Sequence, residues 1–398
     1  MNAQLKTPPS NRDEHWKYAN LRALARLRAA AAMAPGQALI ERALAILPPR
    51  LPQTARAVLI DGFFVAALSD EALHDERHDA SALRLSLGSR ESTSRIARAA
   101  DRYFADLNAE SQGQRLQVSL AAHAVARLEI LCIATSDAHP ALTIELATGA
   151  QLTLIERHLC LDAATTAITN VHWQGRLAAH GSLALARVGH LGPKSHFIET
   201  LELDLDEGAS ARVVQITEGA ASSRSTVYVT HAGRDASLDW QAAALGEVTQ
   251  THDAFVHVAH DAPGARTQQV FRGIAAGRSR IAFNGHMRVA AGASGTDSAQ
   301  SLKGLIAGTE AEVDVRPQLE IYTDAVKASH GATVGKLDAD MLFYLLSRGI
   351  DPGSAESLLK WAFVSDVLAR LPCATLRAQV EATLERLLPG AAAARAGS

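Results

Sequence analysis

The spacing of apolar and polar positions changes twice along the chain. From about residue 115 the period is two: Leu201, Leu203 and Leu205 alternate with acidic residues, which predicts a strand with one dry and one wet face. The same spacing predicts further short strands at 142–147, 152–155, 183–188, 211–216, 226–229 and 281–289. Helical spacing dominates before this region and returns at about residue 338.

Glycines punctuate the predicted strands at a nearly regular step. The dipeptide Gly-Ala recurs at Gly149, Gly208 and Gly264, with Gly181 and Gly233 between them. A turn signal roughly every 25 to 32 residues favours a solenoid of strands, a β-helix in which each rung buries its face on the next. A β-sandwich is the alternative, but no Asn-Gly hairpin chemistry repeats along this region.

The N-terminal third reads as helices around a small hairpin. We expect helix from Asp13 through Trp16 and over 20–33, then over 37–46 and 95–109, with a polar loop at 70–94. Two apolar runs around Asp61-Gly62 predict a hairpin over 58–65. At the C-terminus we expect helices over 341–347, 356–369 and 374–388. Most of the apolar side chains in the first of these are expected in the core, and in the second the apolar side is expected to carry Leu358, Leu359, Ala362, Phe363 and Val367.

These elements suggest three regions: residues 1–110, helical with the hairpin; residues 111–336, the β-helix; and residues 337–398, helical again. The predicted fold class is therefore mainly β, with helical regions on both sides of a parallel β-helix.

Composition narrows the function more than it narrows the fold. With 47% hydrophobic and 20% charged residues the chain can bury a large core, and a formal net charge of -3 argues against a nucleic-acid partner. The three cysteines are far apart and form no CxxC pair, which fits a reducing compartment and excludes a four-thiolate metal site. We expect buried, inert thiols at Cys132 and Cys160 and a structural Cys373. Without an apolar leader or an apolar stretch of spanning length, we expect a cytoplasmic protein outside the membrane.

The stretch from Pro317 to Gly335 carries the most specific information. A strand, PQLEIY (317–322), is followed by small residues in SHGATVG (329–335), which leave one imidazole, His330, accessible. Together with RGI (272–274), FNG (283–285) and LFYLLSRGI (342–350), these motifs resemble the SufD branch of the SufB/SufD family in order and spacing over about 95 residues. Members of this family are scaffold subunits of the SUF iron–sulfur cluster assembly machinery. EHWKY at 14–18 resembles the family's opening.

The resemblance implies a right-handed parallel β-helix that pairs with a SufB-like subunit and binds a SufC-like ATPase through its C-terminal helices. It implies a non-catalytic scaffold that holds a transient iron–sulfur cluster only within the complex, with possible homodimers in isolation. His330 matches the family's proposed cluster ligand at the subunit interface, and imidazole is a reasonable ligand for iron. Candidates for the ATPase contact are Phe343, Tyr344, Arg348, Asp351, Leu358 and Phe363. ATP itself is expected to bind the partner, because no GxxxxGK[ST] phosphate cradle occurs in this chain.

One departure from the family's pattern limits the site. Many relatives have cysteine just before Ser-His, whereas this chain has Ala328, so its loop offers an imidazole but no thiolate. Two alternatives therefore stay open: a structural adaptor for the ATPase that never contacts the cluster, and a carbohydrate-acting β-helix enzyme. The second needs a groove with paired carboxylates and stacked aromatic rings, which an aromatic content of 5% disfavours. His257 and His260, three apart on a strand, are expected on opposite faces and not at one metal.

Overall fold

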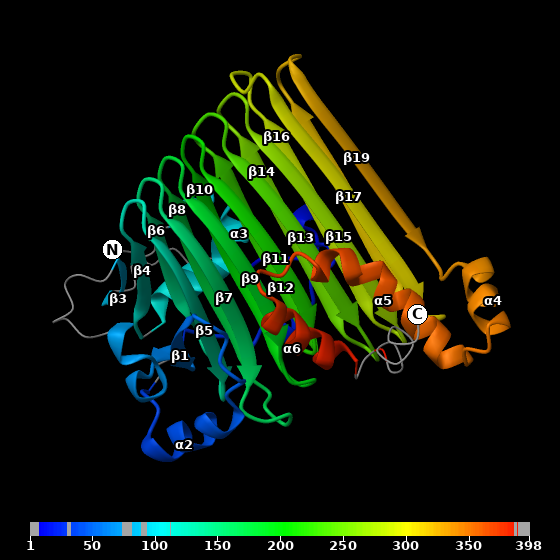
Figure 1. Cartoon of the computed structure of the whole chain (residues 1–398), viewed down its shortest axis with the longest axis horizontal. Helices are drawn as coiled ribbons and strands as arrows, with labels where there is room; N and C mark the ends of the chain where they lie inside the picture. Colours follow the sequence, from blue (N-terminus) through cyan, green and yellow to red (C-terminus); the bar gives the residue numbers. More distant parts are fainter. Residues whose placement is uncertain are drawn as a thin grey trace.

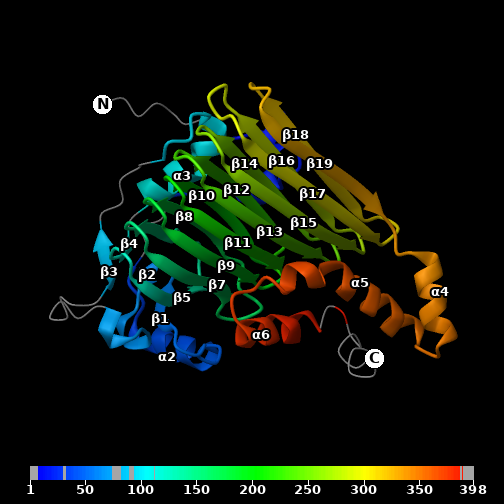
Figure 2. The same ribbon diagram turned by 45° about the horizontal axis from the view of Figure 1, so that its top comes forward.

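The chain winds into a parallel β-helix of about eight turns, with helices at both ends of the sequence. A computed structural model describes residues 8–29, 33–73, 82–88, 94–111, 113–385 and 388. Successive strands alternate between two sheets that face each other across one apolar interior, so each turn contributes one strand to each sheet (Figures 1 and 2). The sequence prediction of a β-helix is confirmed, and the sandwich is excluded.

The first sheet, sheet A, has the spatial order β19-β17-β15-β13-β11-β9-β7-β5-β1-β2. Its strands are β1 (Ala55–Ile60), β2 (Phe63–Phe64), β5 (Val125–Ala134), β7 (Gln151–Cys160), β9 (Ser182–His190), β11 (Ser210–Glu218), β13 (Ser237–Gly246), β15 (Arg266–Ala276), β17 (Thr296–Ala307) and β19 (Val326–Gly335). The second, sheet B, has the order β18-β16-β14-β12-β10-β8-β6-β4-β3. Its strands are β3 (Leu83–Gly88), β4 (Arg115–Leu120), β6 (Ala141–Leu146), β8 (Ile168–Leu177), β10 (His196–Leu205), β12 (Ser222–His231), β14 (Thr251–His260), β16 (Arg280–Val289) and β18 (Glu312–Ile321).

Stacked side chains fix the register between turns. One interior column on sheet B consists of residues that each stand opposite their neighbour in the next strand: Leu146, Leu177, Leu205, His231, His260, Val289 and Ile321. The first six of these side chains are buried, whereas Ile321 in β18 is 40% exposed. A slip of one residue would turn every apolar side chain outward, so the alternation in the sequence determines this register.

The repeated glycines close the turns between strands. Gly149, Gly208 and Gly264 all have positive φ, at 68°, 60° and 72°. A Cβ at Gly208 would lie 2.4 Å from Nδ1 of His180, and one at Gly264 would lie 2.2 Å from Oδ1 of Asp235. Both the backbone conformation and the space therefore require glycine at these steps.

Antiparallel strands and helices cover the beginning of the solenoid. Sheet A starts with the hairpin of β1 and β2, in which Asp61 and Gly62 both have positive φ, as the Asp-Gly prediction requires. Sheet B starts with β3, which runs antiparallel to β4. The predicted loop at 70–94 therefore holds a strand and the short 3-10 helix η3 (Glu71–Leu73), and its residues 74–81 and 89–93 lie outside the described part. Alternating apolar residues at 83, 85 and 87 are the signal that the loop prediction missed.

Helices pack on the outer faces of both sheets. On sheet B lie η1 (Glu14–Trp16), α1 (Leu21–Leu24) and α3 (Ala99–Glu110), with Trp16 and Phe104 buried against Ile198. On sheet A lie α5 (Pro352–Leu368) and α6 (Ala374–Leu384), while α2 (Gln37–Ile46) and η2 (Ala66–Leu68) cover the first turn. The long helix predicted over 20–33 is wrong: α1 spans only four residues, residues 25–29 have turn or irregular structure, and residues 30–32 lie outside the described part.

The C-terminal helices differ from their predicted faces. α4 (Ala339–Ser347) projects from the end of the solenoid, and every residue in it is exposed or half-buried, so its predicted core role is wrong (Figure 1). In α5 the buried stripe is Ala355, Ser357, Trp361, Val364, Val367 and Leu368, while Ala362 is exposed. The helix is apolar on most of its surface, so its sequence alone does not select the face that meets sheet A. No helix in the described part of the chain is long and apolar enough to cross a membrane.

Candidate functional site

The last turn of the solenoid leaves two long strand edges open. Among the described strands, β18 is hydrogen bonded to β16 and β19 to β17, and each ends the order of its sheet. In β19 every residue after Val326 is exposed. Ten-residue edges without a covering element are templates for pairing with another chain, and natural proteins normally shorten, charge or cover them.

His330 lies in this open strand and belongs to the face that continues the interior. It stands opposite Gln300 in β17. Gln300 precedes Leu302 by two residues, and the side chain of Leu302 lies in the apolar core. Because side chains alternate along a strand, Ala328, His330 and Ala332 share the inward face of β19. Within the described residues no further turn covers them, and the imidazole stands exposed at the end of the interior.

A buried amide pair lies directly behind His330. Nε2 of Gln300 donates to Oε1 of Gln269 at 2.8 Å and to the carbonyl of Gly285 at 3.0 Å. A Cβ at Gly285 would lie 2.2 Å from Oε1 of Gln269, which explains the glycine in the FNG motif. Oε1 of Gln300 is buried and has no partner among the described residues, so polarity extends from the interior toward the open end.

The direction of the backbone N–H and C=O groups shows which residues of β18 and β19 can form hydrogen bonds at the open edges. Glu312 and Tyr322 donate to β16, so even-numbered residues of β18 face that strand and Pro317, an odd-numbered residue, faces the open edge. There its missing N–H removes no internal hydrogen bond, as expected for proline in an edge strand. In β17, Asp297 donates to Ala265, so the alternate residues, including Gln300, face β19. Residues directly opposite these, such as His330 and Ala332, present their backbone groups outward.

The inward face of β19 offers an imidazole without a neighbouring thiol. Ala328 lies on this face beside His330. As expected, Cys132 is buried in the interior, whereas Cys160 and Cys373 are only half-buried. The thiol of Cys160 lies 3.0 Å from the Ser195 hydroxyl, and the sulfur of Cys373 accepts from the backbone of Leu376 as the N-cap of α6. An iron–sulfur cluster at His330 would therefore need ligands from another chain.

The residues predicted for docking fall into two groups. Phe343, Tyr344 and Arg348 are exposed on α4, with Phe343 at 72%, and the guanidinium of Arg348 lies 5.1 Å from the Tyr344 ring centre. Asp351 is exposed but caps α5 by accepting from the Ser354 backbone, which is a structural role in itself. Leu358 and Phe363 are half-buried, and Phe363 packs against the core between α5 and sheet A.

A histidine cluster on the outer face of sheet B was not predicted from the sequence. His257 and His260 do face opposite sides, as expected, since His260 is buried beside His231 in the interior. On the outer side Nδ1 of His257 lies 3.2 Å from Nδ1 of His286, and burial together with the charge of His286 lowers the pKa of His257 to about 3. Glu320 in β18 lies 3.1 Å from Nε2 of His286. The signal in the sequence is the 29-residue spacing of His257 and His286, one turn of the solenoid.

A groove along the outer edge of sheet A does not resemble a carbohydrate site. It lies at the beginnings of β9 to β17 and is lined by Ser182, Leu183, Ala184, Ser210, Ala211, Arg212, Ser237, Leu238, Asp239, Arg266, Thr267, Gln268, Asp297 and Ala299. Arg212 lies 3.5 Å from Asp239 and neutralises it. Within the described part of the chain this lining offers no aromatic ring for a sugar to stack on.

Comparison with known proteins agrees with this geometry. The family model described as "SUF system FeS cluster assembly, SufBD core domain" matches residues 132–363. The iron–sulfur cluster assembly protein SufD of Escherichia coli (strain K12) is 30% identical over 96% of this chain and 90% of its own length. A SufBD family protein of Synechocystis is 25% identical over 94% of this chain and 86% of its own. The SufD protein of Bacillus subtilis is 30% identical over 37% of this chain and 34% of its own. The stacked turns that end at His330 thus coincide with the matched core, and the chain belongs to the SufBD family of iron–sulfur cluster assembly proteins.

Proposed function

We propose that this chain is a non-catalytic, cytoplasmic scaffold subunit that pairs with a SufB-like subunit through the edges of β18 and β19. In this role it binds a SufC-like ATPase through α4 and α5 and supplies His330 to a transient iron–sulfur cluster. The observation that carries the proposal is the uncovered end of the solenoid, where two strand edges and one inward-facing imidazole stand together. We also propose that the chain divides into a helical region with a hairpin (1–110), the β-helix (111–336) and the helical region that binds the ATPase (337–398).

The chemistry of the open end supports a β-helix as the partner. Backbone groups of alternate residues in β18 and β19 are available for strand addition, which gives affinity through main-chain hydrogen bonds. Inward-facing Ile321 and Val334, 40% and 43% exposed, would be covered by the interior residues of a second solenoid. A second copy of this chain would satisfy the same edges, so homodimers are expected when the SufB-like partner is absent.

Replacing His330 with Ala tests the proposed ligand. The chain is purified with its SufB-like and SufC-like partners, and iron and sulfide are added under anaerobic conditions. We expect the variant complex to assemble normally but to hold several-fold less iron with cluster absorption, because one imidazole is lost. Thr333→Ala, on the opposite face of the same strand, is the matched control. Cluster yield equal to that of Thr333→Ala would remove the assigned role and favour the structural adaptor.

Replacing Ala332 with Pro tests the edge itself. Ala332 presents its backbone N–H to the open side, so proline removes an edge donor without breaking a bond to β17. Loss of one hydrogen bond costs about 1 kcal/mol or more, and affinity for the SufB-like partner is expected to fall about tenfold. Ala332→Ser, which keeps the donor, is the control. Unchanged affinity in Ala332→Pro, measured by sedimentation or calorimetry, would contradict pairing through this edge.

A further inference from the structure

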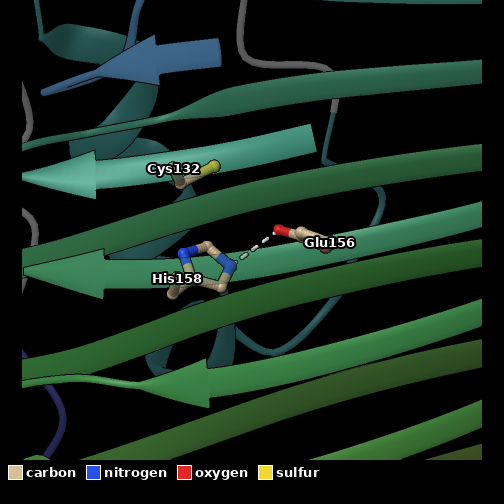
Figure 3. Close-up of side chains that lie close together, drawn as sticks. All are labelled: Cys132, Glu156 and His158. Carbon is tan, nitrogen blue, oxygen red and sulfur yellow. Dashed lines mark hydrogen bonds and ion pairs between the residues drawn. The ribbon is translucent and has the colours of Figure 1, made fainter. Parts of the chain in front are cut away.

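Three potential metal ligands meet inside the first turns of the solenoid, far from the open end. Cys132 in β5 and His158 in β7 stand directly opposite each other, 26 residues apart, which is one turn at this point. Glu156 precedes His158 by two residues and therefore shares its inward face. Figure 3 shows His158 and Glu156 pointing toward each other on β7, with Cys132 on the neighbouring strand β5.

The geometry is compact and dry. One donor atom from each of the three side chains lies within 4.8 Å of the others. Exposed fractions are 3% for Cys132, 0% for Glu156 and 2% for His158. Metal–ligand distances of about 2.0–2.3 Å can be reached by small side-chain rotations from such a starting arrangement.

His158 and Glu156 direct potential ligand atoms at each other. Nε2 of His158 lies 2.8 Å from Oε1 of Glu156. An ion bound by both atoms would take the place of the proton that they share. Nδ1 of His158 is buried without a hydrogen-bond partner among the described residues, and it would carry the ring proton when Nε2 binds the ion. The pair thus supplies two adjacent ligands for one ion.

The charged groups around the site have a net negative charge that a cation would balance. Arg187 bridges Glu156 and Glu199, with Nε 3.0 Å from Oε2 of Glu156 and Nη2 paired with Glu199. Two carboxylates and one guanidinium leave this buried group with one net negative charge. A divalent ion that displaces the thiol proton of Cys132 would bring the total to zero.

A small cavity borders His158. Its volume is about 20 Å³, and its mostly apolar lining includes His158, Arg187, Phe197 and Glu199. This volume is enough for one water molecule. Carboxylates have about four lone-pair sites, so Glu156 can bind an ion and keep its bonds to Arg187.

We propose that Cys132, Glu156 and His158 form a buried binding site for one divalent transition-metal ion of the Zn²⁺, Co²⁺ or Fe²⁺ class. A thiolate, an imidazole and a carboxylate with one open position are a ligand set typical of these ions, not of Mg²⁺ or Ca²⁺. The site differs from the proposed cluster site in place and ligands, and it does not depend on the partner subunits.

The test loads the full-length chain with cobalt while it folds, because a buried site is filled most readily at that stage. Cells producing the chain are grown with added Co²⁺, and the purified protein is analysed for bound cobalt and for a thiolate-to-cobalt charge-transfer band. We expect one cobalt per chain with this band. In Cys132→Ala the band is expected to vanish and retention of cobalt to fall more than about 100-fold, since even second-shell substitutions cost about 10- to 100-fold.

Control variants separate this site from the other thiols and from misfolding. Cys160→Ala and Cys373→Ala should keep both the cobalt and the band. Cys132→Ala should unfold cooperatively by circular dichroism, which shows that metal is lost from a folded chain. Wild-type protein without cobalt, or a band that persists in Cys132→Ala, would overturn the proposal and leave these residues as a metal-free buried polar network.

Discussion

The N-terminal segment is fastened to the solenoid by a buried ion pair whose removal has a calculable cost. Arg224 in β12 is paired with Asp253 in β14, and their side chains are 1% and 2% exposed. The Arg224 guanidinium also lies 4.2 Å from the ring centre of Trp16, so it connects η1 to sheet B. Nε of Arg224 donates to the Thr226 hydroxyl at 3.1 Å.

Arg224→Met would preserve most of the packing volume but leave the Asp253 carboxylate buried without its partner. Breaking a buried pair in this way costs about 3–5 kcal/mol, and the lost contact with Trp16 adds about 1 kcal/mol. The double variant Arg224→Met/Asp253→Asn removes both charges. It is expected to recover at least about 2 kcal/mol, because no uncompensated charge stays in the interior.

The loss of stability in Arg224→Met should also depend on pH. Burial raises the pKa of Asp253 above its ordinary value, although the charge of Arg224 opposes this shift. Without Arg224 the folded-state pKa rises further, so the folded variant holds its proton more tightly than the unfolded chain does. Stability is then highest below the ordinary Asp pKa and is lost as pH rises through the raised folded pKa. The deficit of Arg224→Met relative to wild type should therefore be larger at pH 7 than at pH 4.

Urea unfolding measured between pH 4 and pH 7 tests this reasoning, with tryptophan fluorescence and far-ultraviolet circular dichroism followed together. Coincident transitions are required before a free energy of unfolding is extracted. A deficit below about 1 kcal/mol at pH 7 would refute the assignment of a costly isolated carboxylate. So would a deficit that is the same at pH 4 and pH 7, or a double variant no more stable than Arg224→Met.

Three further predictions concern separate parts of the molecule. Asp101 accepts from Trp16, Tyr228 and His15 at 2.6–2.7 Å, so Asp101→Asn should cost about 2 kcal/mol and speed proteolysis near residues 8–20, while Asp297→Asn on the surface should not. Gly285→Ala would place a Cβ against the Gln269–Gln300 pair and should lower stability by about 1–3 kcal/mol, whereas Gly189→Ala, whose Cβ would lie 3.8 Å from the carbonyl oxygen of Ile216, should be tolerated in thermal melts. Phe343→Ser with Tyr344→Ser should leave the free chain stable but weaken calorimetric affinity for the proposed SufC-like ATPase about 30-fold or more, with Glu145→Ala, an exposed residue of β6, as the unaffected control.

The sequence predicted the turns of the solenoid because their signals are local. Alternation within each strand and glycine at 149, 208 and 264 depend on neighbours a few residues away, and both agree with the structure. Lateral neighbours were not predicted, since the length of a turn varies and a single residue of error moves a side chain to the other face. Thus Cys132 was correctly expected to be buried, but its position opposite His158 follows only from the observed register.

α4 shows a different limit of sequence analysis. Met341, Phe343 and Leu346 have the composition of a core helix, yet they are exposed by 59%, 72% and 37%. Apolar character indicates that a surface is to be covered, but not whether the covering element belongs to the same chain. The same reasoning applies to His330, whose accessibility was predicted from small neighbouring residues but whose inward orientation follows from its pairing with Gln300.

The two ends of the solenoid are treated differently, and this asymmetry has a physical consequence. A stacked repeat array needs capping elements, because its terminal interior faces and strand edges are otherwise open to solvent. The first turn is closed by β2, only two residues long, by antiparallel β3, and by α2, which packs over β1. The last turn ends in β18 and β19, with Ile321 and Val334 exposed on faces that are buried in the preceding turns. A chain that caps one end and, among its described residues, leaves the other end open keeps strand edges available for assembly. In the pairing that we propose, a second solenoid covers these edges, and the His330 imidazole then lies at the seam between the two.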